Sequence, residues 1–272
     1  MPQNARPTLA RLALGDMLRR AREAAGLNPS QAADMIAYHR NTIVRIEGGE
    51  QGTKPLVVEK LCELYRTPTE QMSVMTRLAL EGKERGWWEG YIDGPSKHAV
   101  VLETEVEASL IRTWDPEHIP GLLQTPDYLQ AVQANLPYLD AKMATAVRDL
   151  RLKRQELVWG RRDKFEVQMI IGAAAILYLK KMPSRVVAMQ IERLRRFAAR
   201  PNVDIRIVDR VHAAMDGGFS ILTPGRLSRP PFAVVTSLDG IRYIEESAVV
   251  SRYEMAFANS RKAAGSLEEY LR

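Results

Sequence analysis

Apolar residues recur at helical spacing through the first quarter of the chain. Between Leu14 and Leu27 they share one face of a predicted helix, and Gly26 supplies a stop signal at its end. Asn28 then suits the N-cap, and Pro29 the first position, of a short second helix. The pattern therefore predicts two helices joined by a tight connection.

The next stretch, AYHRNTIVRIEGGE, predicts a third helix with two unlike sides. At about 100° per residue, Ile43 and Ile46 lie on one side, which is suited to packing on protein. The other side presents Asn41, Val44 and Arg45. In the major groove an asparagine can pair with adenine, an arginine with guanine, and a valine can contact the thymine methyl. This side is therefore a candidate base-reading surface, and a fourth helix is predicted after it over LVVEKLCELYRT.

The pattern changes in the second half of the chain. Thr125 and Asp140 are predicted to cap helices, the second of which runs to about Trp159, and further amphipathic helices are predicted over 184–199 and 249–264. Between and around these helices the period becomes that of strands. The predicted strands are FEVQMII, VDIRIVD, GFSILTP, FAVVTSL and IRYIEE. We therefore expect an α+β protein, with a helical bundle followed by a mixed domain of helices backing an antiparallel sheet.

The amino-acid composition is typical of a globular protein, and the net charge favours an anionic partner. Of the 272 residues, 46% are hydrophobic and 26% are charged, which is typical of a folded protein. The formal net charge of +6 favours a polyanionic partner only modestly. The distribution of charge is more informative, because residues 1–22 hold five arginines against one acid, Asp16.

Other residue counts exclude several kinds of site. The single cysteine, Cys62, rules out an intramolecular disulfide framework and a cysteine-rich zinc site, and its apolar neighbours indicate a core position. The four histidines have no ligand-like spacing, so we expect no metal and no cofactor. No signal sequence opens the chain, and no apolar run approaches the roughly 18 residues of a membrane span. A cytoplasmic protein without membrane contact is therefore expected.

The segment GLNPSQAADMIAYHRNTIVRIEGG resembles the helix-turn-helix of the phage-repressor-like XRE family, whose second helix lies in the major groove of double-stranded DNA. The resemblance implies a structural ion pair between Arg22 and Glu47. The chain departs from the family at Ala37, where a turn glycine is usual, and at His39, where a serine or threonine caps the recognition helix. The DNA-contacting residues expected from the resemblance and from the helix face are Arg40, Asn41, Thr42, Val44 and Arg45, with Lys54 on phosphate.

A second resemblance covers most of the remaining chain. It rests on three segments, WWEGYIDG, LETEVEASLIRTWDPEHIPGLLQTPDYLQAV and RLKRQEL, which are similar to a large actinobacterial group of regulators related to WhiJ. In that group a repressor-like head precedes a domain of poorly defined function, sometimes described as antitoxin-like. One departure is Ala174, near which many relatives carry an acidic residue.

Pattern and resemblance together divide the chain into parts. The expected parts are a basic flexible arm over 1–11, a helix-turn-helix DNA-binding domain over 12–68, a linker helix over 69–86, and a regulatory and dimerisation domain over 87–272.

Three clusters outside the helix-turn-helix keep two interpretations each. The acids Glu103, Glu105 and Glu107 suggest a paired-carboxylate site or a solvated edge. The basic segment RLRRFAAR suggests a second polyanion contact or the wet face of an amphipathic helix. A group of large aromatic side chains suggests a ligand pocket or a core. Its members are Trp87, Trp88, Tyr91, Trp114 and Tyr128.

The sequence favours a sequence-specific DNA-binding transcriptional regulator. We expect a homodimer whose carboxyl domain senses a small-molecule effector or a small protein partner. The alternative is an antitoxin-like module that mainly sequesters a protein partner and binds DNA to regulate its own expression. An enzyme has the least support, because the sequence shows no nucleophile-base pair and no Gly-rich phosphate loop, so no catalytic residues are expected.

Overall fold

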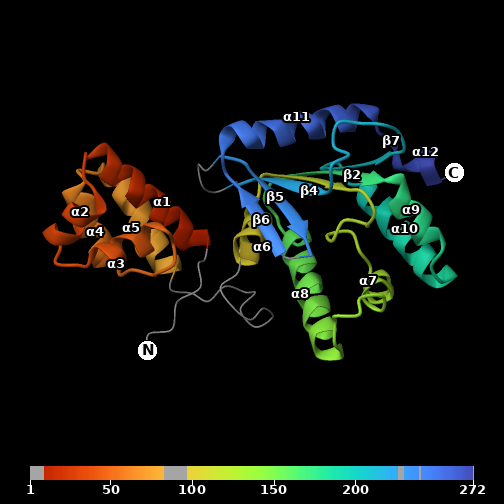
Figure 1. The fold of residues 1–272 in the computed structure, drawn as a ribbon, viewed down its shortest axis with the longest axis horizontal. Coiled ribbons are helices and arrows are strands. Elements are labelled where there is room, and N and C mark those ends of the chain that lie inside the picture. The colour runs from red at the N-terminus through yellow and green to blue at the C-terminus, as the bar shows by residue number, and fades with distance from the viewer. Residues whose placement is uncertain (1–8, 83–96, 226–229, 239, 272) are drawn as a thin grey trace. The chain divides into compact units, whose positions relative to one another are not determined.

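The chain forms two compact units, Met1–Glu103 and Thr104–Arg272. The computed structural model describes residues 9–82, 97–225, 230–238 and 240–271 (Figure 1). No helix within these described ranges has the length and apolar character needed to cross a membrane.

The first unit contains a bundle of short helices. Their bounds are α1 Leu9–Ala24, α2 Pro29–Met35, α3 Arg40–Glu47, α4 Pro55–Leu64 and α5 Thr69–Glu81. Because α1 begins at Leu9, residues 9–11 of the segment expected to be a flexible arm are helical, while 1–8 lie outside the described residues.

Close packing holds the bundle together. Helices α1 and α3 cross at Gly15, where an added Cβ would lie 2.4 Å from the carbonyl oxygen of Glu47. Helix α5 packs against α1 and α4 and buries Met75 and Leu78. The part of the expected linker helix that the structure describes is therefore an element of this bundle core.

The second unit is built on a mixed sheet. Its strands run in the order β6-β5-β4-β1-β2-β3-β7. Their bounds are β1 Leu110–Asp115, β2 Glu166–Gly172, β3 Val203–Val208, β4 Phe219–Thr223, β5 Phe232–Ser237, β6 Gly240–Ile244 and β7 Gly265–Ser266. The expected α+β class is confirmed, and the five predicted strands correspond to β2 through β6.

The centre of the sheet differs from the antiparallel arrangement expected throughout. Strand β2 pairs in parallel with both β1 and β3, whereas the remaining pairs are antiparallel. The parallel pairs arise because the chain returns through helices between these strands, and strand alternation alone does not distinguish this connection from a hairpin. Strand β1 was missed because the charged Arg112 interrupts its apolar pattern; the structure pairs Arg112 with Glu254 at 2.6 Å.

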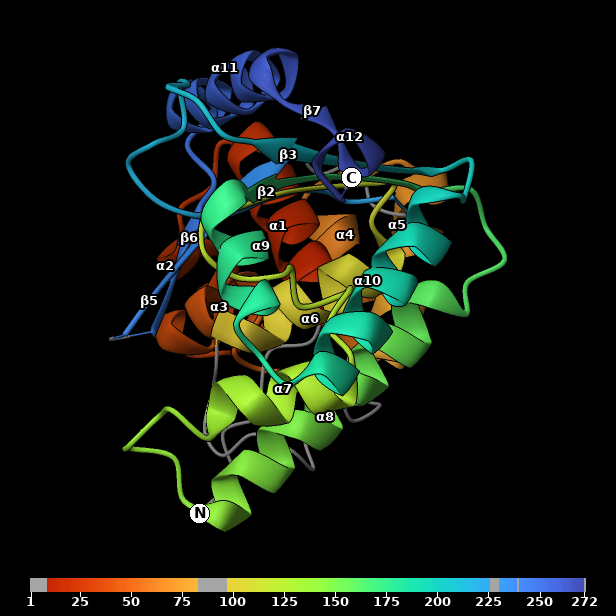
Figure 2. The same cartoon turned by 90° about the vertical axis from the view of Figure 1, so that its right-hand side faces the viewer.

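Helices cover both faces of the sheet. Their bounds are α6 Lys97–Glu107, α7 Pro126–Gln133, α8 Ala141–Trp159, α9 Ala173–Lys180, α10 Ser184–Ala198, α11 Ser247–Ala263 and α12 Leu267–Leu271. Helix α11 lies over one face, and α9 and α10 lie against the other (Figures 1 and 2). Under α11, Phe257 packs with Trp114, Ile170 and Phe219. The predicted caps are confirmed, since the side chains of Thr125 and Asp140 accept backbone hydrogen bonds at the starts of α7 and α8.

Candidate nucleic-acid interface

Helices α2 and α3 are joined by a tight turn. The side chain of Asn28 accepts a hydrogen bond from the Gln31 N–H, and the side-chain oxygen of Gln31 accepts one from the Asn28 N–H, so α2 starts with a complete capping box. Ala37 in the turn has a φ of 57°, the left-handed region that favours glycine. This conformation accounts for the glycine that the XRE family usually carries there. His39 occupies the N-cap of α3 without a side-chain cap hydrogen bond.

Helix α3 is held from one side only. Ile43 and Ile46 are buried in the bundle, which leaves the opposite side of this eight-residue helix at the surface. The residues expected to contact DNA from this helix are Arg40, Asn41 and Val44, which are exposed, and Thr42 and Arg45, which are half-buried. Val44 is 43% exposed, so its methyl groups are accessible at the surface of α3.

Lys54 lies at the start of the next helix. It is exposed and occupies the N-cap of α4, which has no side-chain cap hydrogen bond. At the start of α4, Pro55 has no N–H, and the N–H groups of Val57 and Val58 donate to the Lys54 carbonyl at 2.9 and 3.2 Å. The exposed ammonium of Lys54 is therefore the group there that suits a phosphate.

The structure brings Arg22 and Glu47 together beneath α3. Arg22 donates from Nε and Nη2 to the two carboxylate oxygens of Glu47, at 2.7 and 2.9 Å, and from Nη1 to the Leu27 carbonyl at 2.7 Å. Both side chains are less than a tenth exposed. The hydrogen bond to Glu47 raises the pKa of Arg22, and burial raises the pKa of the adjacent Tyr65. Glu47 thus ties the end of α3 to α1 and to the α1–α2 connection.

In the second unit, a largely buried loop is held by side chains from two helices. The loop is IPGLLQT, 119–125, and its carbonyl groups accept hydrogen bonds from long side chains of α8 and α10. Gln155 donates to Gly121 and Gln124, and Trp159 donates to Leu122 at 2.8 Å. From α10, Gln190 and Arg193 donate to the Leu123 carbonyl. These contacts explain why a buried loop is tolerated there.

Arg193 was expected on a wet helix face, and this expectation is wrong. Its guanidinium bonds the Leu123 carbonyl at 2.9 Å and the side-chain oxygen of Gln155 at 2.8 Å. Burial, together with the charges of the neighbouring Arg196 and Arg200, lowers the pKa of Arg193 to about 10. The helical wheel did not reveal this role because the carbonyl groups that Arg193 binds come from a distant loop.

Charged groups are also buried near the end of β1. Glu105 is 2% exposed and accepts a hydrogen bond from Arg154 at 2.6 Å, so the interpretation of these acids as a solvated edge fails at this position. Arg151 donates to the side chain of Gln124, and burial lowers its pKa to about 10. Burial also raises the pKa of the Asp115 carboxyl to about 6.

Replacing Asp115 with asparagine is expected to flatten the pH dependence of stability. A carboxyl whose folded pKa is raised keeps its proton in the folded state, so the second unit loses stability as the pH rises from about 4 to about 6. Asp115→Asn should therefore match the wild type near pH 4 and exceed it above pH 6 by on the order of 2 kcal/mol. Urea unfolding at pH 4.5, 6 and 7.5 measures this. Asp216→Asn, at an exposed position, is the control; a constant difference between Asp115→Asn and wild type contradicts the prediction.

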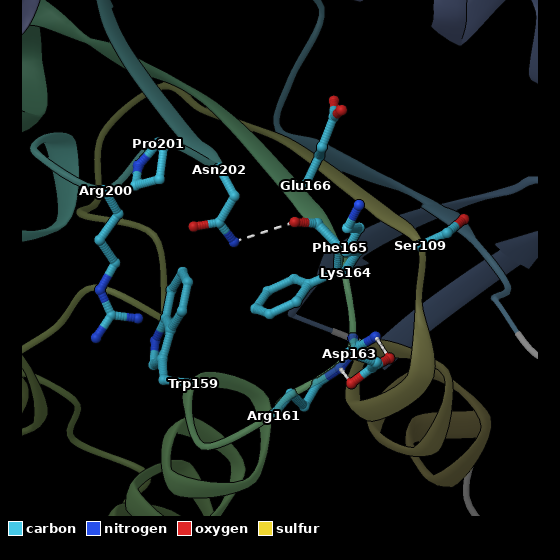
Figure 3. Close-up of a pocket in the computed structure, with 10 residues that line it drawn as sticks. All are labelled: Ser109, Trp159, Arg161, Asp163, Lys164, Phe165, Glu166, Arg200, Pro201 and Asn202. Carbon is cyan, nitrogen blue, oxygen red and sulfur yellow. Dashed lines mark hydrogen bonds and ion pairs between the residues drawn. The ribbon is translucent and has the colours of Figure 1, made fainter.

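The second unit also contains a hollow of about 540 Å³ at the ends of α8 and α10 (Figure 3). Trp159 and Phe165 contribute rings whose centroids are 6.2 Å apart. Arg161 donates to Asp163 at 2.5 Å and lies over the Phe165 ring, while Asn202 donates to the Phe165 carbonyl at 3.0 Å. These contacts keep the wall of the hollow in place.

Of the five aromatic residues expected to form either a ligand pocket or a core, the structure describes two. Trp114 and Tyr128 are buried, and Tyr128 accepts a hydrogen bond from the Ile119 N–H at 3.1 Å. Trp87, Trp88 and Tyr91 lie outside the described residues. Among the residues that the structure describes, no group of three or more His, Cys, Asp or Glu side chains could hold a metal ion.

Two families match the chain. A family described as a domain of unknown function (DUF5753) matches residues 99–270, and a family described as a helix-turn-helix domain matches residues 13–74. No curated protein matches. The first match spans the sheet and its covering helices, and the second spans α2, α3 and α4 and most of α1.

Proposed function

Because the chain belongs to the DUF5753 family and carries a helix-turn-helix domain, it is a DNA-binding regulator, and we propose that it recognises a specific operator sequence through α3. The observation that carries the proposal is the two-sided character of α3: Ile43 and Ile46 anchor it, and the opposite side is left at the surface. The resemblance to the XRE family supports the same assignment.

The chemistry of that side suits base reading. Asn41 can bond bidentately to adenine and Arg45 to guanine, while the exposed Val44 can contact a thymine methyl. Lys54 is assigned to phosphate, where it orients the domain without selecting a sequence. The bidentate ion pair of Glu47 with Arg22 serves to orient the helix that carries the reading residues.

The test compares a base-reading residue with a phosphate-binding residue. Arg45→Ala should weaken binding to the cognate duplex by roughly 1 to 3 kcal/mol and relax specificity at one base pair. Lys54→Ala should weaken binding to every duplex alike and reduce the salt dependence. Both variants are titrated against the cognate duplex and a scrambled duplex. Equal losses on the two duplexes from Arg45→Ala would sink base reading by that residue.

We propose further that the carboxyl part, 87–272, forms the homodimer and receives a small-molecule or protein signal. In support, apolar side chains stand at the surface of two of its helices: Met143 on α8 is 51% exposed and Met255 on α11 is 59% exposed. The domain division into 1–11, 12–68, 69–86 and 87–272 belongs to the same proposal, except that 9–11 lie in α1 and 69–81 form α5 of the bundle. The small surface of α3 favours a dimer, because a single head offers few contacts to DNA.

A further inference from the structure

The hollow at the ends of α8 and α10 combines an aromatic surface with cations. The Arg200 guanidinium lies over the Phe197 ring at 4.6 Å and the Trp159 ring at 5.4 Å. Within the described part of the chain, Arg200 and Lys164 form no ion pair with a carboxylate. A half-buried arginine that has only ring contacts keeps its hydrogen-bond donors available to a ligand.

The acids of the hollow do not neutralise Arg200. Asp163 is held by Arg161 at 2.5 Å, and the Glu166 carboxylate points away from Trp159 and Arg200 (Figure 3). Arg193 and Arg196, on α10, also lie over the Phe197 ring, so cations are concentrated near the C-terminal end of α10. An anion that enters the hollow therefore meets a positive local field.

The lining also offers a surface for a flat group. Trp159 is half-buried, packs on Phe197 with a centroid distance of 4.4 Å, and lines the hollow. Asn202 uses its amide nitrogen on the Phe165 carbonyl, which leaves its side-chain oxygen on the side of Arg200 and Trp159 (Figure 3). That oxygen can accept a hydrogen bond from a ring N–H or a hydroxyl. The volume of about 540 Å³ is of the size that holds a small organic ligand.

We propose that this hollow binds a small planar aromatic anion, with its ring against Trp159 and its anionic group at Arg200. Either a nucleoside phosphate or an aromatic carboxylate has this chemistry. The inference rests on the proposed sensing role of the carboxyl part and names the class of effector. Trp159 also donates to the Leu122 carbonyl, so a ligand that contacts Trp159 is linked through this side chain to the buried loop 119–125.

The test is calorimetric titration of the full chain, without DNA, with adenosine monophosphate and with salicylate. Adenosine and inorganic phosphate are the controls for the ring and the charge. We expect saturable one-to-one binding of at least one aromatic anion, and at least tenfold weaker binding of inorganic phosphate. Arg200→Gln should weaken binding at least fivefold. Arg196→Gln, a matched change at the end of α10 and outside the lining of the hollow, should alter it less than twofold.

Three results would overturn the proposal. The first is that neither aromatic anion saturates the protein at 1 mM, and the second is that Arg200→Gln and Arg196→Gln weaken binding equally. The third is that single-stranded oligonucleotides bind more tightly in proportion to their length, which would indicate a polyanion surface. Operator affinity is then measured with and without the aromatic anion that binds. If binding depends on Arg200 but operator affinity does not change, the binding site is upheld and the sensing role is contradicted. Failure of the binding site and failure of the sensing role are therefore distinguishable.

Discussion

A fragment of residues 1–82 is expected to bind the operator about 10² to 10⁴ times more weakly than the full chain, because a second head supplies an effectively intramolecular contact. One head presents the short helix α3 and a few phosphate-binding groups, so a single head should bind near the non-specific range of roughly 10⁻⁴ to 10⁻⁶ M. Two heads joined by a two-fold dimer would contact half-sites about 34 to 36 Å apart. The fragment ends after α5 rather than at Pro68, because Met75 and Leu78 belong to the bundle core.

Solution mass and operator affinity of the fragment and the full chain decide this prediction. Circular dichroism establishes that the fragment is folded, and a scrambled duplex provides the non-specific baseline. Moving the half-sites apart by half a helical turn should weaken the full chain and leave the fragment unaffected. A fragment that remains dimeric, or that binds within threefold of the full chain, would place the dimer in the head.

Glu47→Gln is expected to lower the free energy of unfolding of the same fragment by about 3 kcal/mol, because it leaves the Arg22 charge buried without its carboxylate. The double change Arg22→Met with Glu47→Leu should recover most of this loss, since it removes both charges and keeps apolar volume. Urea denaturation measures both effects. A large loss of operator affinity should accompany Glu47→Gln, because α3 loses its tie to α1.

A matched control is available on the other side of α3. Arg45 and Glu50 form a long contact of 3.9 Å between side chains that are 41% and 68% exposed. Glu50→Gln should therefore change stability by less than about 0.5 kcal/mol. If Glu47→Gln has as small an effect as Glu50→Gln, the buried pair does not hold α3 in place.

In the helical bundle of the first unit, the local sequence pattern predicts several structural features correctly. The cap at Asn28 and the inward pair Ile43 and Ile46 depend on residues within a few positions of one another, and the structure contains both. The unusual turn at Ala37 was indicated only by the resemblance to the XRE family, which usually has a glycine there. Nothing in the local sequence pattern requires a φ of 57° at this residue.

In the carboxyl part, the sequence by itself determined the elements that local periodicity encodes. These are the caps at Thr125 and Asp140, the helices that follow them, and the strands β2 to β6. It did not determine the parallel pairing of β1, β2 and β3, because strand order depends on how the connecting helices cross the sheet.

Tertiary structure alone decided which polar residues are buried and what they bind. The residues around Glu105 in the sequence are typical of a solvated acid. In the structure Glu105 is buried and is paired with Arg154, which is 49 positions away. Arg193 has the spacing of a wet helix face, yet it donates to a carbonyl 70 positions away. The hollow around Trp159 likewise joins segments from Ser109 to Asn202. Desolvation and pairing depend on distances in space, and helical or strand periodicity carries no information about partners so remote along the chain.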